Sequence, residues 1–199
     1  MEFREKYIDV HTHHPLPDVI SPSMEGIHPW QATANFSLPN FDACDLIGET
    51  GLDFASDVDR VAQETLFKAH LSEAERLKKG VVLHVVKAFE PAMNILAKYN
   101  LCGVVFHGFV GSTEQAKRCF KRGYHLSFGH RSLASPRTVE VIKVTPEEFL
   151  FCETDDAPSP SIEEIYGRVA ELRNTSVEEL RRSIAQNYNR LIFKGWQIG

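Results

Sequence analysis

The chain has 199 residues, of which 43% are hydrophobic and 25% are charged, the balance of an ordinary soluble globular protein. This length fits one generous domain or two small ones, and we expect a single domain over residues 1–199. The net charge of −5 argues against a protein that wraps long nucleic acid, because such binding needs a broad basic face. The longest apolar runs are short, as in 81–86 with His84 inside it, so the sequence predicts no membrane span.

The four cysteines and the N-terminal residues favour a cytoplasmic location. No C-x-x-C pair occurs among Cys44, Cys102, Cys119 and Cys152, and the first residues do not fit a secretory signal. We therefore expect reduced thiols that pack as small core residues.

Short apolar runs alternate with longer amphipathic stretches along the chain. The runs predicted as buried parallel strands are 7–11, 25–28, 45–49, 81–84, 103–107, 125–128 and 148–153. The predicted helices are one over 56–77 capped by Ser56, one with Pro91 in its first turn, one from Ser112 to near Gly123, and one that begins with a capping box of Ser176 and Glu179.

This alternation predicts an α/β fold, either a (β/α)8 barrel or a doubly wound sheet. No G-x-G-x-x-G motif follows the first strand, and the chain contains no G-x-x-x-x-G-K-[ST] motif. A nucleotide-binding sheet therefore loses its main support, and the barrel is favoured.

Polar side chains stand at or just past the C-terminal end of several predicted strands. They are His11, Glu49, His84, His107 and Asp155. Their spacing fits the βα units of a barrel, so we expect them to converge on its C-terminal face, where barrel active sites are built. One such residue alone is more often a satisfied core or ion-paired group. Several in the same register need a common partner.

Imidazoles that converge with carboxylates form a metal environment suited to zinc and similar divalent ions. His11 and His13 lie on the same face of a strand end, so both can bind one ion. With His13 the set has six ligands, which is too many for one tetrahedral zinc that keeps an open position, and this favours two metal ions. Zinc, manganese and magnesium all remain open as their identity. His28 ends the second predicted strand and is a candidate pocket residue.

These residues lie in segments that resemble the TatD family of metal-dependent hydrolases, within the amidohydrolase superfamily. The similar segments are 9–13, 26–29, 47–53, 63–74, 82–84, 107–111, 153–158 and 187–193. The resemblance implies a (β/α)8 TIM-like barrel with a two-metal site. By the same resemblance, His11, His13, Glu49 and Asp155 hold one ion, and Glu49, His84 and His107 hold the other.

The chain is shorter than the family pattern on its N-terminal side. Only fourteen residues separate His13 from His28, where the family usually has a helix and a further strand, and the stretch from Trp30 to Asp45 is too short for a full helix. We therefore expect a trimmed barrel that lacks one or two helices, with 18–21 as the remnant of a strand. The uncovered surface predicts either a covering loop or a homodimer contact.

The substrate-contacting residues differ more from the family than the ligands do. An Arg that usually follows the His84 position by two residues is Val86 here, with Lys87 next. The usual substrate loop after 157–158 is replaced by 159–161. The chemistry of the family therefore carries over better than its substrate.

The resemblance implies hydrolysis by a water that two metal ions activate, with Asp155 as the base that takes its proton. His28 and Lys87 are then expected near the substrate, and Asp53 and Glu153 are expected to orient ligands.

Three functions stay open at this point. The first is a phosphodiesterase, most simply a deoxyribonuclease of TatD type that acts on short DNA ends. The second is an amidohydrolase or lactonase that acts on a small metabolite, which the net charge of −5 favours. The third is a non-catalytic metal-binding protein, against which the complete ligand set weighs. The basic group of Lys117, Arg118, Lys121 and Arg122 is better interpreted as a solvated helix face.

Overall fold

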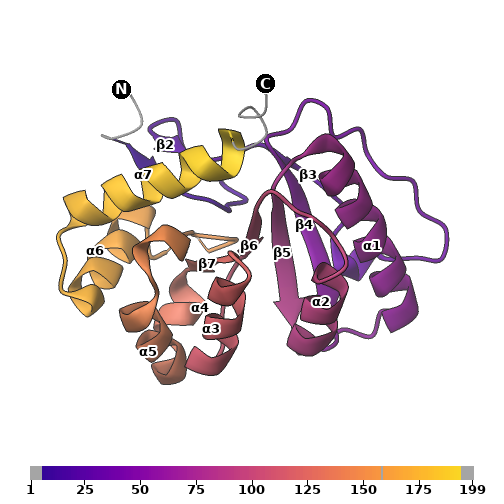
Figure 1. The fold of residues 1–199 in the computed structure, drawn as a ribbon. Coiled ribbons are helices and arrows are strands. Elements are labelled where there is room, and N and C mark those ends of the chain that lie inside the picture. Colours follow the sequence, from indigo (N-terminus) through magenta and orange to yellow (C-terminus); the bar gives the residue numbers. More distant parts are fainter. Residues whose placement is uncertain (1–5, 158, 194–199) are drawn as a thin grey trace. The chain divides into compact units, whose positions relative to one another are not determined.

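The structure is a computed structural model that describes residues 6–157 and 159–193. Two compact units make up the chain: the first contains Met1–Pro22 and His107–Arg190, and the second contains Ser23–Phe106 and Leu191–Gly199. Each unit combines parallel strands with helices, which confirms the predicted α/β class (Figure 1). Pro158, which ends one of the family-like segments, lies outside the described residues.

The first unit joins the beginning of the chain to its second half. Its elements are β1 (Tyr7–Ile8), β2 (Val19–Ile20), α3 (Thr113–Lys121), β7 (His125–Phe128), α4 (His130–Leu133), α5 (Pro136–Val144), the 3-10 helix η3 (Glu147–Phe149), β8 (Leu150–Cys152), α6 (Ile162–Arg173) and α7 (Val177–Phe193), of which the part up to Arg190 belongs to this unit. Strand β1 pairs in parallel with β2, and β7 pairs in parallel with β8.

The first strand of the chain also runs beside the last. The Val10 N–H donates to the Cys152 carbonyl at 3.2 Å, and Thr12 forms a parallel bridge with Asp155. A buried tyrosine of α6 holds β1, because the Tyr166 hydroxyl donates to the Ile8 carbonyl at 2.9 Å. First and last strands as neighbours are what the closed order of a barrel requires.

The second unit is built on a parallel sheet in the order β3-β4-β5-β6. Its elements are β3 (Met24–Glu25), the 3-10 helix η2 (Pro29–Gln31), β4 (Leu46–Asp53), α1 (Arg60–Leu77), β5 (Val81–Val86), α2 (Phe89–Leu96) and β6 (Val104–Phe106). Figure 1 shows α1 and α2 lying beside these strands. The continuous apolar start of β5 fits a strand that is buried on both faces.

The N-terminal side is trimmed as the residue spacing predicted. In the described part of the chain before β4, η2 is the one helical element, and β2 lies where a remnant strand was predicted. A loop supplies the cover in the second unit: Phe36 and Leu38 pack against Ala62 and Leu66 of α1. Lys79 holds the end of this loop by donating hydrogen bonds to the carbonyls of Phe41, Asp42 and Cys44.

Helix caps follow the sequence signals with one exception. Ser112 accepts from the Gln115 N–H at 3.2 Å, and Ser176 accepts from the Glu179 N–H at 3.2 Å, as predicted. The prediction of Ser56 as the cap of α1 is wrong, because Asp59 caps this helix by accepting from Ala62 N–H at 2.7 Å.

Among the described residues, no helix is both long and apolar enough to pass through a membrane.

Strand β4 is longer than the predicted run 45–49, since it continues to Asp53. Its glycines resemble turn residues in the sequence but serve close strand packing. A Cβ on Gly51 would collide with the His84 carbonyl of β5, so glycine lets the two backbones approach. The extension brings Asp53 into register with Val86.

Candidate metal centre

Two imidazoles and a carboxylate meet in the first unit. One donor atom from each of His11, His107 and Asp155 lies within 4.8 Å of the others, and we call these residues the first cluster. His11 Nε2 is 3.5 Å from Asp155 Oδ1, and the rings of His11 and His107 have centroids 4.3 Å apart. His11 is only 3% exposed. Nitrogen and carboxylate donors this close fit a divalent cation such as zinc.

His13 reaches the same carboxylate from the surface. Its Nε2 is 3.7 Å from Asp155 Oδ1, and 53% of its side chain is exposed. Asp155 itself has a left-handed backbone with φ of 57°, a conformation that aspartate adopts more readily than most residues. The two histidines of the H-x-H pattern therefore both face Asp155, one from the interior and one from solvent.

Carboxylates behind the first cluster hold its parts in place. Glu153 Oε1 lies 3.3 Å from His107 Nδ1, so it orients that imidazole. Asp9 accepts from the Thr154 N–H at 3.1 Å and from the Thr154 hydroxyl at 2.6 Å. Burial raises the pKa of Asp9 to about 7, although the Thr154 hydrogen bonds act to lower it. Asp9 thereby ties the end of β1, which precedes His11, to the end of β8.

A second group of two imidazoles and a carboxylate lies within the second unit. Donor atoms of His28, Glu49 and His84 all lie within 4.8 Å of one another, and we call these residues the second cluster. Glu49 is central, because its Oε1 is 2.8 Å from His84 Nδ1 and 3.3 Å from His28 Nε2. His28 was predicted as a pocket residue, and the structure places it directly against Glu49.

Asp53 supports the second cluster from the end of β4. Its Oδ2 accepts from His84 Nε2 at 3.1 Å and from the Trp30 indole N–H at 2.7 Å. Burial by itself would raise the pKa of Asp53, but the hydrogen bonds from Trp30 and His84 hold it below its ordinary value. The backbone of Asp53 is fixed by Gln63, which exchanges two hydrogen bonds with it.

Sequence reasoning assigned no role to Trp30, Gln63 or Asp9. Trp30 follows His28 by two residues, and Gln63 and Asp9 lie inside family-like segments, so position alone could have marked them. Lys87 lies just after β5 with an exposed side chain, three residues beyond His84.

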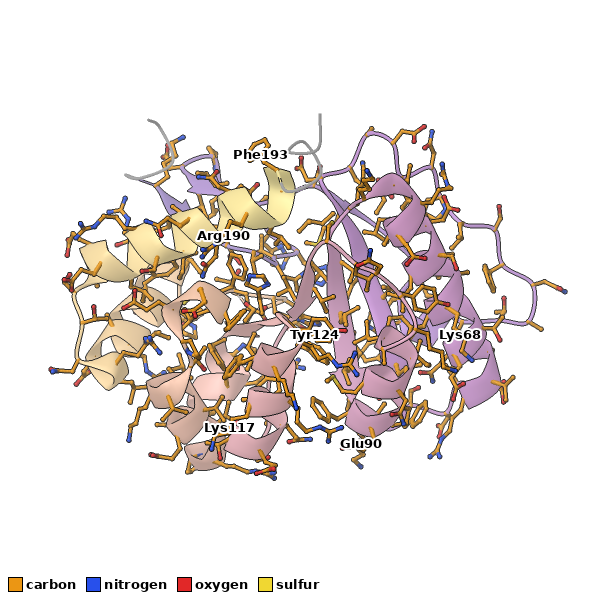
Figure 2. The ribbon with its side chains drawn as sticks, viewed as in Figure 1. Lys68, Glu90, Lys117, Tyr124, Arg190 and Phe193 are labelled. Carbon is orange, nitrogen blue, oxygen red and sulfur yellow. The ribbon has the colours of Figure 1, made fainter. Side chains whose placement is uncertain are left out.

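Among the described residues, His14, His70, His125 and His130 belong to none of the donor groups that could hold a metal ion. His70 is fully buried, accepts from the Ile27 N–H at 3.0 Å and contacts the Leu66 carbonyl at 2.9 Å, as a packed core histidine should. His130 begins the short helix α4, directly after Gly129. The basic side chains of α3, among them Lys117 labelled in Figure 2, are exposed, as a solvated face requires.

Comparisons with known proteins agree on one family. The sequence model of the family described as TatD related DNase matches residues 9–193 of this chain. A TATDN1 homolog of Vairimorpha ceranae is 35% identical over 136 residues, which are 65% of this chain and 50% of that protein. The uncharacterized metal-dependent hydrolase YabD of Bacillus subtilis is 29% identical over 164 residues, which are 73% of this chain and 64% of YabD. The chain thus spans about half to two thirds of the length of these relatives.

A solved structure of a TatD homolog has a similar fold. The TatD homolog YjjV of Escherichia coli superposes with a TM-score of 0.77 at 21% identity, over 96% of this chain and 99% of that chain. At this identity the likeness establishes the fold, which is the α/β, TIM-like fold predicted from the sequence.

Proposed function

We propose, because the chain belongs to the TatD related DNase family, that it is a divalent-metal-dependent hydrolase that cleaves phosphodiester bonds, most simply at short DNA ends. The observation that carries this proposal is the pair of clusters, each with two imidazoles and one carboxylate within 4.8 Å. Such donor sets suit first-row divalent cations, and two cations suit phosphoryl transfer.

The residues present fit the metal ions that the family implies. His11, His107 and Asp155 would hold one ion with help from His13, and Glu49, His84 and His28 would hold another. The family's own division, in which Glu49 is shared between the ions and His107 joins His84, stays a prediction. When bound, the ions supply a lowered water pKa and polarisation of the scissile phosphoryl oxygen.

Asp155 takes up and returns the proton that is transferred during hydrolysis. Asp155 accepts a proton from the attacking water, the water oxygen forms a bond to phosphorus, and the bond from phosphorus to the leaving oxygen breaks. Asp155 returns the proton to that leaving oxygen. Its position beside His11 and His13 orients the carboxylate for this work.

Glu153 and Asp53 act through the histidines that they touch. Each accepts a hydrogen bond from an imidazole, Glu153 from His107 and Asp53 from His84, which fixes the ring and its tautomer. Lys87 is a candidate phosphate contact, because it follows the strand that carries His84.

Two observations favour a second candidate, an amidohydrolase or lactonase of a small metabolite. The chain has a net charge of −5, which opposes a long anionic substrate. The first unit also has a cavity of about 220 Å³ whose apolar lining includes Leu16, Val19, Ala157 and Ile162, with Asp9 and Thr154 also on its wall. A cavity of this size and polarity suits a small uncharged group.

The proposal includes two further predictions from the sequence, a cytoplasmic location and a homodimer contact. Cys44, Cys119 and Cys152 are buried thiols outside any disulfide, as a cytoplasmic protein would keep them. A homodimer contact at the trimmed side stays a prediction beside the loop cover that the second unit shows.

The decisive experiment is a substrate panel with added manganese or zinc. Oligodeoxynucleotides, simple phosphodiesters, lactones and acyl amides are assayed with wild-type protein and with His11→Ala, and Lys117→Ala on the exposed face of α3 is the control. We expect phosphodiester cleavage that is lost in His11→Ala and kept in Lys117→Ala. Turnover of lactones with no phosphodiester cleaved would replace the first candidate by the second.

A further inference from the structure

The indole of Trp30 combines wide exposure with fixed placement. Trp30 is 61% exposed, yet its ring is anchored at one edge by the hydrogen bond from its N–H to Asp53 Oδ2 at 2.7 Å. Its backbone N–H donates to His28 Nδ1 at 3.2 Å, and Pro29 before it is buried. An exposed apolar side chain is ordinarily unremarkable, but one held at both backbone and ring is preorganised.

The same ring borders the second cluster. Its centroid is 4.6 Å from that of His28 and 5.8 Å from that of His84, and both contacts are edge-to-face. Neither imidazole is stacked parallel to the indole, and 61% of Trp30 stays open to solvent. A flat aromatic face thus stands directly beside the groups that would hold a metal ion and a scissile phosphate.

We propose that the exposed indole face of Trp30 is a stacking site for a nucleobase of the substrate. This inference rests on the proposed phosphodiesterase function and names which part of the nucleotide the second unit recognises. A nucleotide whose phosphate binds at the second cluster carries its base within reach of the neighbouring ring. Stacking of bases on aromatic side chains tolerates any sequence, because every base has a π-face. It also needs no basic surface, which agrees with a net charge of −5.

Trp30 has a second task that the experiment must separate from stacking. Its N–H supports Asp53, which in turn supports His84. Trp30→Phe removes the N–H but keeps an aromatic face, whereas Trp30→Leu removes both. Val61→Ala is the matched control, because Val61 is 72% exposed on α1 of the same unit.

KM and kcat are measured for a short oligothymidylate and for an abasic chain of equal length. We expect Trp30→Leu to raise KM for oligothymidylate about 5- to 150-fold more than KM for the abasic chain, which is the range of base–aromatic stacking, because loss of the hydrogen bond to Asp53 affects both substrates alike. Trp30→Phe should keep most of the preference for the base-containing chain, and Val61→Ala all of it. An equal rise of KM on both substrates in Trp30→Leu would overturn the stacking site.

A binding measurement without turnover completes the test. The chain has two tryptophans, so in a Trp196→Phe background the fluorescence reports on Trp30 alone. We expect oligothymidylate to quench this fluorescence and the abasic chain to leave it unchanged. Quenching by bases with no chain cleaved would support the stacking site while refuting the phosphodiesterase. Cleavage with neither quenching nor a base-dependent KM would refute the stacking site and leave the phosphodiesterase standing.

Discussion

Replacing Gln63 with leucine tests how the second cluster is held in place. Gln63 is fully buried on α1, and its side chain accepts from the Asp53 N–H at 2.7 Å and donates to the Asp53 carbonyl at 2.9 Å. It also donates to the Val58 carbonyl at 3.0 Å. Leucine has a similar volume but no polar atom. The variant therefore leaves the buried Asp53 N–H without this partner, while the Asp53 carbonyl keeps the hydrogen bond that the Ser56 hydroxyl donates at 2.8 Å.

The magnitude follows from those groups. An unpaired buried donor costs about 1–3 kcal/mol and the lost hydrogen bond to the Val58 carbonyl about 0.5–1.5 kcal/mol, so the two together cost about 2–4 kcal/mol. In a chain of this length that lowers Tm by roughly 5–15 °C. A loosened Asp53 also orients His84 less well, and loss of such a partner weakens metal binding by about 10- to 100-fold.

Thermal unfolding and zinc titration of the same preparation check both effects. Gln115→Leu is the control, because Gln115 closes a partly exposed capping box on α3 and should cost about 1 kcal/mol. A Gln63→Leu protein that melts with the Gln115→Leu control would refute the hydrogen-bond argument. A destabilised protein with unchanged zinc affinity would refute the coupling from Asp53 to His84.

Two further predictions concern turnover and pH. Asp155→Asn should lower kcat by at least about 100-fold with little change in Tm, and rates near wild type would exclude Asp155 as the base. Burial lowers the pKa of His70 below 6.5, so the unfolded chain binds this proton more readily. His70 therefore contributes stability above about pH 6.5 that is lost as the pH falls. The drop in Tm between pH 7.5 and 5.5 should be smaller in His70→Gln than in wild type, and equal drops would contradict this assignment.

The sequence predicted those features of the fold that depend on residues close together in the chain, such as helix caps. The caps at Ser112 and Ser176 depend on neighbours three residues away, and both are confirmed. The cap of α1 shows the limit, because Ser56 and Asp59 are both good caps. Ser56 instead donates its hydroxyl to the Asp53 carbonyl at 2.8 Å, a contact set by the end of β4.

In the candidate site, too, some residues could be predicted from the sequence and others could not. Strand-end histidines and carboxylates were recognisable from periodicity, since parallel strands present their ends together. The groups behind them were not, because their partners are remote in the chain: Trp30 meets Asp53 23 residues away, and Asp9 meets Thr154 145 residues away. The extension of β4 was also hidden, because Gly51 looks like a turn residue until β5 lies against it.

Metal content and phosphodiester cleavage, measured on one reconstituted sample, test the central claim most directly. Protein freed of metal by chelation is titrated with manganese or zinc, and bound metal and cleavage rate are followed together. We expect two bound equivalents and a cleavage rate that rises with loading. Less than one bound equivalent, with no cleavage gained when metal is added, would contradict the account.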